Sequence, residues 1–194
     1  MNRREALKNT AVWLGTAISA TTFGVLFESF TLPENEKNTI SFSAGQEQVL
    51  AELAEIIIPT TKDIPGAKAA GLGSFIPMMV TDCFPAKTQE AFAEGLKAME
   101  ATALKDFNKD FLSLSSQERE QLVNKLRLDT IAQQKADKAA KKNVPYFFVI
   151  ARDLTVLGYF ASEIGCTQAR EYLAIPGRYD GATDLKPGQK SWAS

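Results

Sequence analysis

Residues 146–164 read YFFVIARDLTVLGYFASEI and form the most hydrophobic stretch of the chain after its first 30 residues. Its charged residues are Arg152, Asp153 and Glu163. A helix that is apolar on most sides is either buried in a core or covered by a partner. Charges on such a helix must be paired or exposed, so we expect structural pairing of these charges, for instance of the carboxylates with Arg170 or Arg178, and an interface role is the alternative. The stretch therefore predicts one strongly hydrophobic helix within an all-α fold.

Helix-start signals precede this stretch along the chain. Ser43 and Gln46 have the spacing of a capping box, and so do Ser115 and Glu118. Apolar residues at three- and four-residue spacing follow both boxes, and they recur through residues 86–107. The apolar stripe expected for residues 86–107 consists of Phe92, Leu96, Met99 and Leu104. These patterns predict amphipathic helices that pack against one another.

Proline and glycine set the remaining boundaries. A short helix is expected over residues 74–83, with Pro77 tolerated in its first turn. Residues 43–164 are long enough for a small all-α domain of about five helices. Residues 1–30 are set apart as a signal peptide or anchor helix, and residues 31–42 are expected to be a linker.

The C-terminal segment, residues 165–194, holds glycine and proline too closely spaced for regular structure. It nevertheless keeps more apolar side chains than a disordered tail requires, namely Tyr172, Ile175, Tyr179, Leu185 and Trp192. An extended segment with aromatic anchors is expected of an arm that lies on another protein surface. We therefore predict an extended C-terminal arm.

The N-terminus has the pattern of a twin-arginine export signal. Arg3, Arg4 and Lys8 precede an uncharged apolar run over residues 9–27. This receptor-read route carries proteins that fold before they cross the membrane, which suits a chain that holds a cofactor or brings a partner. A plain signal anchor is the alternative. Residues 17–19 fit the small-x-small rule of a cleavage site, but cleavage there would leave an apolar new terminus. The sequence therefore allows both a cleaved peptide and a retained anchor.

Composition argues against several function classes. The 194 residues contain no histidine, which removes the commonest general base and the commonest metal or haem ligand. No Gly-x-Gly-x-x-Gly motif and no phosphate-binding loop follows a strand-like run. The 22 basic and 23 acidic residues are well mixed, so we expect no nucleic-acid partner. We predict that this chain is not an enzyme and that it holds neither a cofactor nor a metal.

The two cysteines are Cys83 and Cys166. In an exported protein an even number of cysteines is compatible with a disulfide, which would here close a long loop. The alternative is a pair of thiols that pack as small buried hydrophobic groups. Geometry decides between the two, and the sequence does not supply it.

Several strings of residues resemble one protein family. In the C-terminal half these are LGYFASEIG at 157–165, TQ at 167–168 and IPGRYDG at 175–181, with Trp192-Ala193 near the end. In the N-terminal half they are LAEIIIPTT at 53–61, PGA at 65–67 and DCFP at 82–85. Together with the twin-arginine start, the chain resembles the gluconate 2-dehydrogenase subunit 3 family over nearly its whole length.

The resemblance implies a non-catalytic small subunit of a membrane-associated sugar or polyol dehydrogenase. In such complexes a large flavoprotein subunit of the GMC type binds FAD and oxidises the substrate, and a cytochrome c subunit usually takes the electrons. The large subunit typically lacks an export signal and crosses the membrane bound to the small one. The resemblance thus implies a periplasmic location at the inner membrane, reached through the twin-arginine translocase, and an escort role for this chain.

The expected anchors of the partner interface are Tyr159, Phe160, Arg178, Tyr179 and Trp192.

The chain departs from the family pattern at its cysteines. It has Gly181-Ala182 where the family often has Gly-Cys, and Cys166 where the family often has alanine. The alternative function is a stand-alone, membrane-anchored helical module that uses the hydrophobic helix to bind a ligand or a protein.

Overall fold

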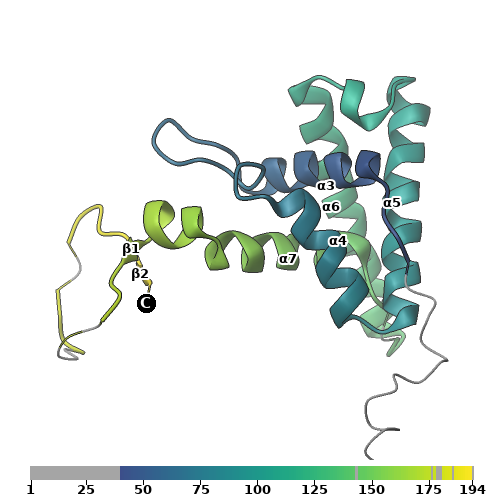
Figure 1. The fold of residues 1–194 in the computed structure, drawn as a ribbon. Coiled ribbons are helices and arrows are strands. Elements are labelled where there is room, and N and C mark those ends of the chain that lie inside the picture. The colour runs from purple at the N-terminus through teal and green to yellow at the C-terminus, as the bar shows by residue number, and fades with distance from the viewer. Residues whose placement is uncertain (1–39, 143, 176, 178–180, 185, 194) are drawn as a thin grey trace, which may run out of the picture. The chain divides into compact units, whose positions relative to one another are not determined.

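The computed structural model describes residues 40–142, 144–175, 177, 181–184 and 186–193. Arg3, Arg4, Lys8 and the expected signal helix lie outside the described residues, as do most of the expected linker and the predicted anchors Arg178 and Tyr179. The main helices are α3 (Ala44–Ile57), α4 (Leu72–Cys83), α5 (Ala86–Phe107), α6 (Ser116–Ala139) and α7 (Phe147–Ala161) (Figure 1). The short elements are the 3-10 turn η2 (Phe111–Ser113), the π-helical turn η3 (Gly165–Ala169) and the strands β1 (Glu171–Tyr172) and β2 (Trp192–Ala193). The described part of the chain is mostly helical, which confirms the predicted all-α class.

Both predicted capping boxes are present. In α3 the Gln46 amide donates to Ser43 Oγ at 3.3 Å, and the Ser43 amide donates to Gln46 Oε1 at 2.9 Å. In α6 the Ser115 amide donates to the Glu118 carboxylate at 2.8 Å. This bond, together with one from Lys109, lowers the pKa of Glu118 to about 2. The first turns of both helices are thus fixed by side chains that the sequence pattern identifies.

Helix α4 begins two residues earlier than predicted, at Leu72 instead of Ser74. Gly71 precedes it with a φ of 76°, a left-handed conformation that glycine adopts without strain. Pro77 therefore lies in the helix interior, not in the first turn. Gly73 also brings α4 close to α3, because a Cβ on Gly73 would lie 2.8 Å from the Glu47 carbonyl oxygen and the Ala51 Cβ. The early start thus allows tight contact between α3 and α4.

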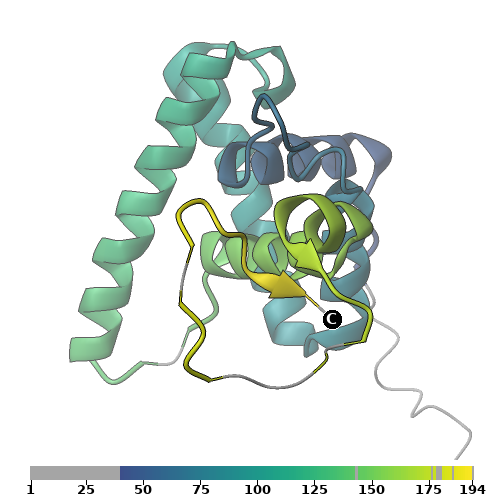
Figure 2. The same ribbon diagram turned by 90° about the vertical axis from the view of Figure 1, so that its left-hand side faces the viewer.

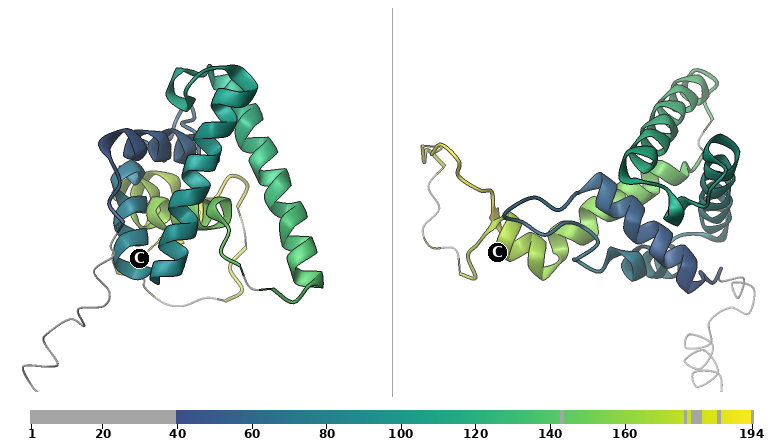
Figure 3. Two further views of the ribbon diagram at one scale, coloured as in Figure 1. Left: turned by 90° about the vertical axis from the view of Figure 1, so that its right-hand side faces the viewer. Right: turned by 90° about the horizontal axis from the view of Figure 1, so that it is seen from above.

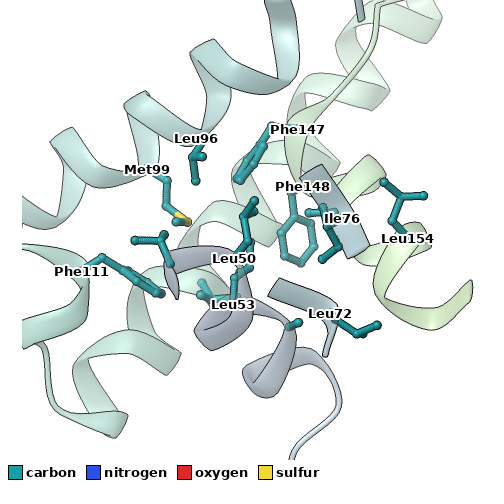
Figure 4. Packing of buried hydrophobic residues seen from close by; sticks show 14 of the residues in the cluster. Leu50, Leu53, Leu72, Ile76, Leu96, Met99, Phe111, Phe147, Phe148 and Leu154 are labelled. Carbon is teal, nitrogen blue, oxygen red and sulfur yellow. The ribbon is translucent and has the colours of Figure 1, made fainter. Parts of the chain in front are cut away.

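Helix α7 is the hydrophobic stretch that the sequence singles out, and it packs against α3, α4, α5 and α6. Figure 4 shows its side chains Phe147, Phe148 and Leu154 among those of the other helices. The Phe147 ring lies 4.9 Å from the Phe92 ring of α5, centroid to centroid. Gly95 makes this approach possible, since a Cβ there would lie 2.2 Å from the Phe147 Cβ. Of the two alternatives that the sequence left open, most of α7 is thus buried in the core of this chain, while Val156 and Leu157 are exposed.

The apolar stripe of α5 differs from the prediction at its last position. Phe92, Leu96 and Met99 are buried, but Leu104 is 56% exposed and Ala103 is buried in its place. Ala103 follows Met99 by four residues and so stays on the same face, whereas a residue five positions on is turned away from it. The predicted stripe is therefore wrong at Leu104.

The C-terminal segment contains more regular structure than predicted. Cys166 and its neighbours form the turn η3, and β1 pairs with β2 in parallel, with Glu171 opposite Trp192. The Glu171 amide donates to the Ser191 carbonyl at 2.9 Å, and the Leu173 amide donates to the Ala193 carbonyl at 2.8 Å. In Figure 2 the two strands lie next to the end of α7. The ends of the arm are thus held together by a short pairing.

Within the part of the chain that the structure describes, every helix is too short or too polar to cross a membrane.

Candidate functional site

Of the large apolar side chains that are exposed in the described residues, about half lie on the last turns of α7 and on the arm that follows. We call this set the arm surface, and its members are Val156, Leu157, Tyr172, Leu173, Ile175 and Trp192. Ile175 is 84% exposed and Trp192 is 55% exposed. Large apolar groups that collect at one end of a domain are typical of a surface that another molecule covers. In Figure 3 the arm extends away from α5 and α6, so neither helix covers it.

The predicted anchors fall into different environments. Trp192 lies on β2 and belongs to the arm surface. Phe160 is half-buried, and the Arg170 guanidinium lies over its ring at 4.5 Å from the centroid. Tyr159 is 3% exposed and is part of the hydrophobic core, so its side chain offers no contact area to a partner in this conformation. Tyr159 is thus a core residue here, not the exposed anchor that its sequence position suggests.

Tyr159 holds the loop between α3 and α4. Its hydroxyl donates to the Pro65 carbonyl at 2.8 Å, although 94 residues separate the two along the chain. Burial raises the pKa of Tyr159, and the nearby charge of Glu55 adds to the increase. The hydroxyl therefore stays protonated and remains a donor to the loop.

Glu55 at the end of α3 is the second residue that fixes this loop. Its carboxylate accepts hydrogen bonds from the Thr60 amide at 2.8 Å and from the Lys68 amide at 2.9 Å. Burial disfavours the charged form, but these hydrogen bonds outweigh it and hold the pKa of Glu55 below its ordinary value. Gly66 is required beside it, because a Cβ there would lie 2.6 Å from both carboxylate oxygens.

Glu55, Thr60, Pro65, Gly66 and Tyr159 thus form one hydrogen-bonded unit, which we call the loop latch. Sequence reasoning does not assign a role to Glu55. The available signal is an acidic residue on the last turn of an apolar helix, followed by a loop of threonine, proline and glycine. Such a loop has amide groups that need acceptors, and a carboxylate can provide two of them.

The cysteines are not bonded, and Cys83 is exposed while Cys166 is partly buried. The start of α4 lies beside the end of α7, because a Cβ on Gly158 would lie 2.5 Å from the Phe75 ring. Cys83 ends α4, two helical turns or about 12 Å beyond Phe75, whereas Cys166 follows the end of α7 in η3. The disulfide that the sequence left open is therefore not formed in this structure, and Cys83 is an exposed thiol instead of a buried one.

The charges of α7 pair differently from the prediction. The Arg152 guanidinium donates to the neighbouring Asp153 carboxylate at 2.7 Å, and both side chains are exposed. Arg170, one of the suggested partners, instead contacts the Phe160 ring. The charged pair thus lies on the exposed side of α7 and needs no partner from the arm.

The described residues offer little for redox or hydrolytic chemistry. Among them, no group of three cysteine, aspartate or glutamate side chains could hold a metal ion. The only sheet in the described ranges is the pair of two-residue strands, and a dinucleotide such as FAD binds to a much larger parallel sheet in the folds of the Rossmann type. The residues present therefore do not fit FAD, and the prediction that this chain carries no cofactor stays a prediction.

The comparisons with known proteins point to one family. A family model described as gluconate 2-dehydrogenase subunit 3 matches residues 44–177, which run from the first residue of α3 into the arm. Neither the search of curated proteins nor the search of solved structures returned a match.

Proposed function

We propose that this chain, which belongs to the gluconate 2-dehydrogenase subunit 3 family, uses its arm surface to hold the catalytic subunit of the complex. Family membership supports a role as a subunit of a dehydrogenase complex. We propose further that the chain is a non-catalytic small subunit and that it binds a FAD-dependent dehydrogenase of the GMC type. In this proposal FAD and substrate belong to the large subunit, and a cytochrome c subunit receives the electrons.

The observation that carries the proposal is the exposure of the arm surface. In the isolated chain the side chain of Ile175 is almost fully exposed to water, and that of Trp192 is more than half exposed. Burial of such area stabilises an interface by about 25 cal/mol per Å², and aromatic residues often dominate binding energy. The arm follows α7 through η3, and the pairing of β1 with β2 links its two ends, so it can follow the surface of a partner without disturbing the core.

The proposed export signal at the N-terminus would take the complex across the inner membrane. Arg3, Arg4 and Lys8 would direct the chain to the twin-arginine translocase. A large subunit that receives FAD in the cytoplasm must cross the membrane folded, and binding to this chain would carry it along. The proposed location is therefore the periplasmic side of the inner membrane.

The interface is tested by co-expression of the tagged full-length chain with the dehydrogenase subunit of its host. The variant carries Ile175→Asp and Trp192→Ala, and its matched control carries Leu104→Asp, an equally exposed leucine on α5. We expect the variant to lose the co-purifying large subunit and its flavin absorbance, while the control retains both. Full retention of the flavoprotein by the double variant, or by a chain truncated before residue 170, would contradict the proposal.

The escort role needs a separate measurement. Replacement of both Arg3 and Arg4 by lysine should leave the complex assembled but confine both subunits to the cytoplasm. Fractionation of cells followed by flavin absorbance in each fraction provides the readout. Periplasmic flavoprotein in cells that express only the double-lysine variant would refute the escort role without affecting the interface.

A further inference from the structure

A groove of about 380 Å³ lies between α3, α6 and α7, on the opposite part of α7 from the arm. Its floor is core, since Val123 and Phe148 are only 5% and 6% exposed. The apolar lining consists of Ile56, Ile57, Val123, Ile131, Phe148 and Val149. A concave site of this volume with a mainly apolar lining has the dimensions of a small-molecule pocket.

Two arginine side chains line this groove. Arg127 comes from α6, and Arg152 comes from α7. The Arg127 guanidinium donates twice to the Asn124 amide oxygen, at 2.9 and 3.2 Å, and it has no ion pair among the described residues. A guanidinium that bonds only to a neutral oxygen still has free N–H donors and an uncompensated positive charge, and both can bind an anion. Arg152 is paired with Asp153 and contributes less net charge.

We propose that this groove binds an amphiphile that consists of an aliphatic chain and an anionic head group. The chain would lie on the apolar floor, and Arg127 would bind the carboxylate or phosphate of the head through two parallel hydrogen bonds. Glu120 also lines the groove, two helical turns or about 10 Å from Arg127 along α6, and its charge keeps the head at the arginine end.

The chemistry of the lining favours an aliphatic chain over a sugar. The lining also includes the polar residues Asn124, Thr130 and Gln134, but a sugar that covered the isoleucine, valine and phenylalanine floor would leave some of its hydroxyl groups unpaired there, which is costly. A cationic amphiphile would find one carboxylate, Glu120, but would also meet the charge of Arg127, which has no ion pair among the described residues, so we expect it to bind more weakly. The shared class of ligand is therefore a fatty acid or the anionic head and acyl chain of a phospholipid. This inference does not rest on the arm surface or on the proposed dehydrogenase partner.

The test measures binding of dodecanoate and of dihexanoyl-phosphatidylglycerol to the full-length chain, each below its micelle concentration, by calorimetry without detergent. Dodecyltrimethylammonium serves as the oppositely charged probe. We expect saturable binding of at least one anionic probe and at least tenfold weaker binding of the cation. Tighter binding of dodecanoate indicates a free fatty acid as the natural source, and tighter binding of the phosphatidylglycerol indicates a membrane lipid.

Two matched pairs of variants locate the site on α6. Arg127→Gln should weaken binding of the anionic probe about tenfold, whereas Lys135→Gln, an exposed lysine outside the groove, should not change it. Ile131→Glu should abolish binding, whereas Leu128→Glu, on the exposed side of the same helix, should preserve it. All four positions are exposed, so the variants should fold.

The proposal is overturned by any of three results. These are equal affinity for the anionic and cationic probes, no saturable binding of either anionic probe, and binding that neither Arg127→Gln nor Ile131→Glu weakens. Loss of the flavoprotein partner in the arm variants would leave these results unchanged, so failure of one proposal is distinguishable from failure of the other.

Discussion

Replacement of Glu55 by glutamine tests whether the loop latch stabilises the domain. The carboxylate accepts two backbone amide hydrogen bonds, and Gly66 packs directly against it. Glutamine can accept only one of these bonds, and its amide group would face the other backbone N–H. Hydrogen bonds to charged groups are worth about 1.5–3 kcal/mol, and an unsatisfied donor costs about 1–3 kcal/mol. Since Glu55 is partly exposed, we expect a loss of about 1.5–3 kcal/mol in the free energy of unfolding.

The measurement is urea unfolding of the full-length chain, followed by far-ultraviolet circular dichroism. Amide hydrogen exchange provides a local readout, because the Thr60 and Lys68 amides should lose protection first. The matched control is Glu90→Gln, an exposed glutamate of α5 whose side chain makes no ion pair among the described residues. Equal stability of the two variants, with Thr60 and Lys68 still protected, would refute the reasoning.

The same residue predicts a pH dependence. The folded pKa of Glu55 lies below its ordinary value of 4.5, so the ionised form stabilises the fold at neutral pH. This contribution is lost as the pH falls below about 4.5 and through the folded pKa. The free energy of unfolding of the wild type should therefore fall more steeply with acid than that of Glu55→Gln. Parallel curves would contradict the assignment of this pKa shift to the loop latch.

Three further changes follow from contacts in the core and at the helix ends. Tyr159→Phe removes the hydrogen bond to Pro65 and should cost about 1 kcal/mol in urea unfolding, with faster exchange of the loop amides. Gly95→Ala forces a methyl group against Phe147 and should destabilise the domain by about 1–3 kcal/mol in the same assay, despite the higher helix propensity of alanine. Glu118→Gln should remove a stabilising contribution that is lost between about pH 4.5 and 2, and acid titration of the circular dichroism signal checks it.

Each of these three has its own control or contrary outcome. Gly45→Ala serves as the control for Gly95→Ala, because the nearest atom to its added Cβ is 3.9 Å away. Unchanged exchange of the loop in Tyr159→Phe would show that Glu55 holds the loop without it. An acid transition of Glu118→Gln identical to that of the wild type would exclude a role of Glu118 in that range.

The helices were predictable where local chemistry determines them. Ser43 and Ser115 mark helix starts through contacts that reach only three residues along the chain, and such contacts are readable from spacing. The burial of α7 was also predictable, because a helix with so few charges needs cover on most sides. The start of α4 was missed because it depends on the left-handed conformation of Gly71 and on contact with α3.

The candidate site was predictable only in outline. The arm was expected to present apolar anchors, and Trp192 is exposed, but Tyr159, the anchor expected on α7, is buried. Tyr159 is buried where α7 packs against the other helices and its hydroxyl reaches Pro65, a contact 94 residues away in the chain that sequence spacing does not report. The role of Glu55 was missed for the same reason, since its partners Thr60 and Lys68 are ordinary loop residues until the fold brings their amides together.

The strand pair that joins the ends of the arm makes the arm nearly independent of the stability of the helical core, so substitutions in the two parts are limited in different ways. Its two backbone hydrogen bonds are worth about 1 kcal/mol each, so opening the pair leaves the helical core intact. Substitutions in the core are limited by the stability of the domain, whereas substitutions on the exposed arm cost little in folding. If the arm is the interface that we propose, it can change along with its partner while the helical core stays the same, and small subunits of one fold can diverge to serve different large subunits.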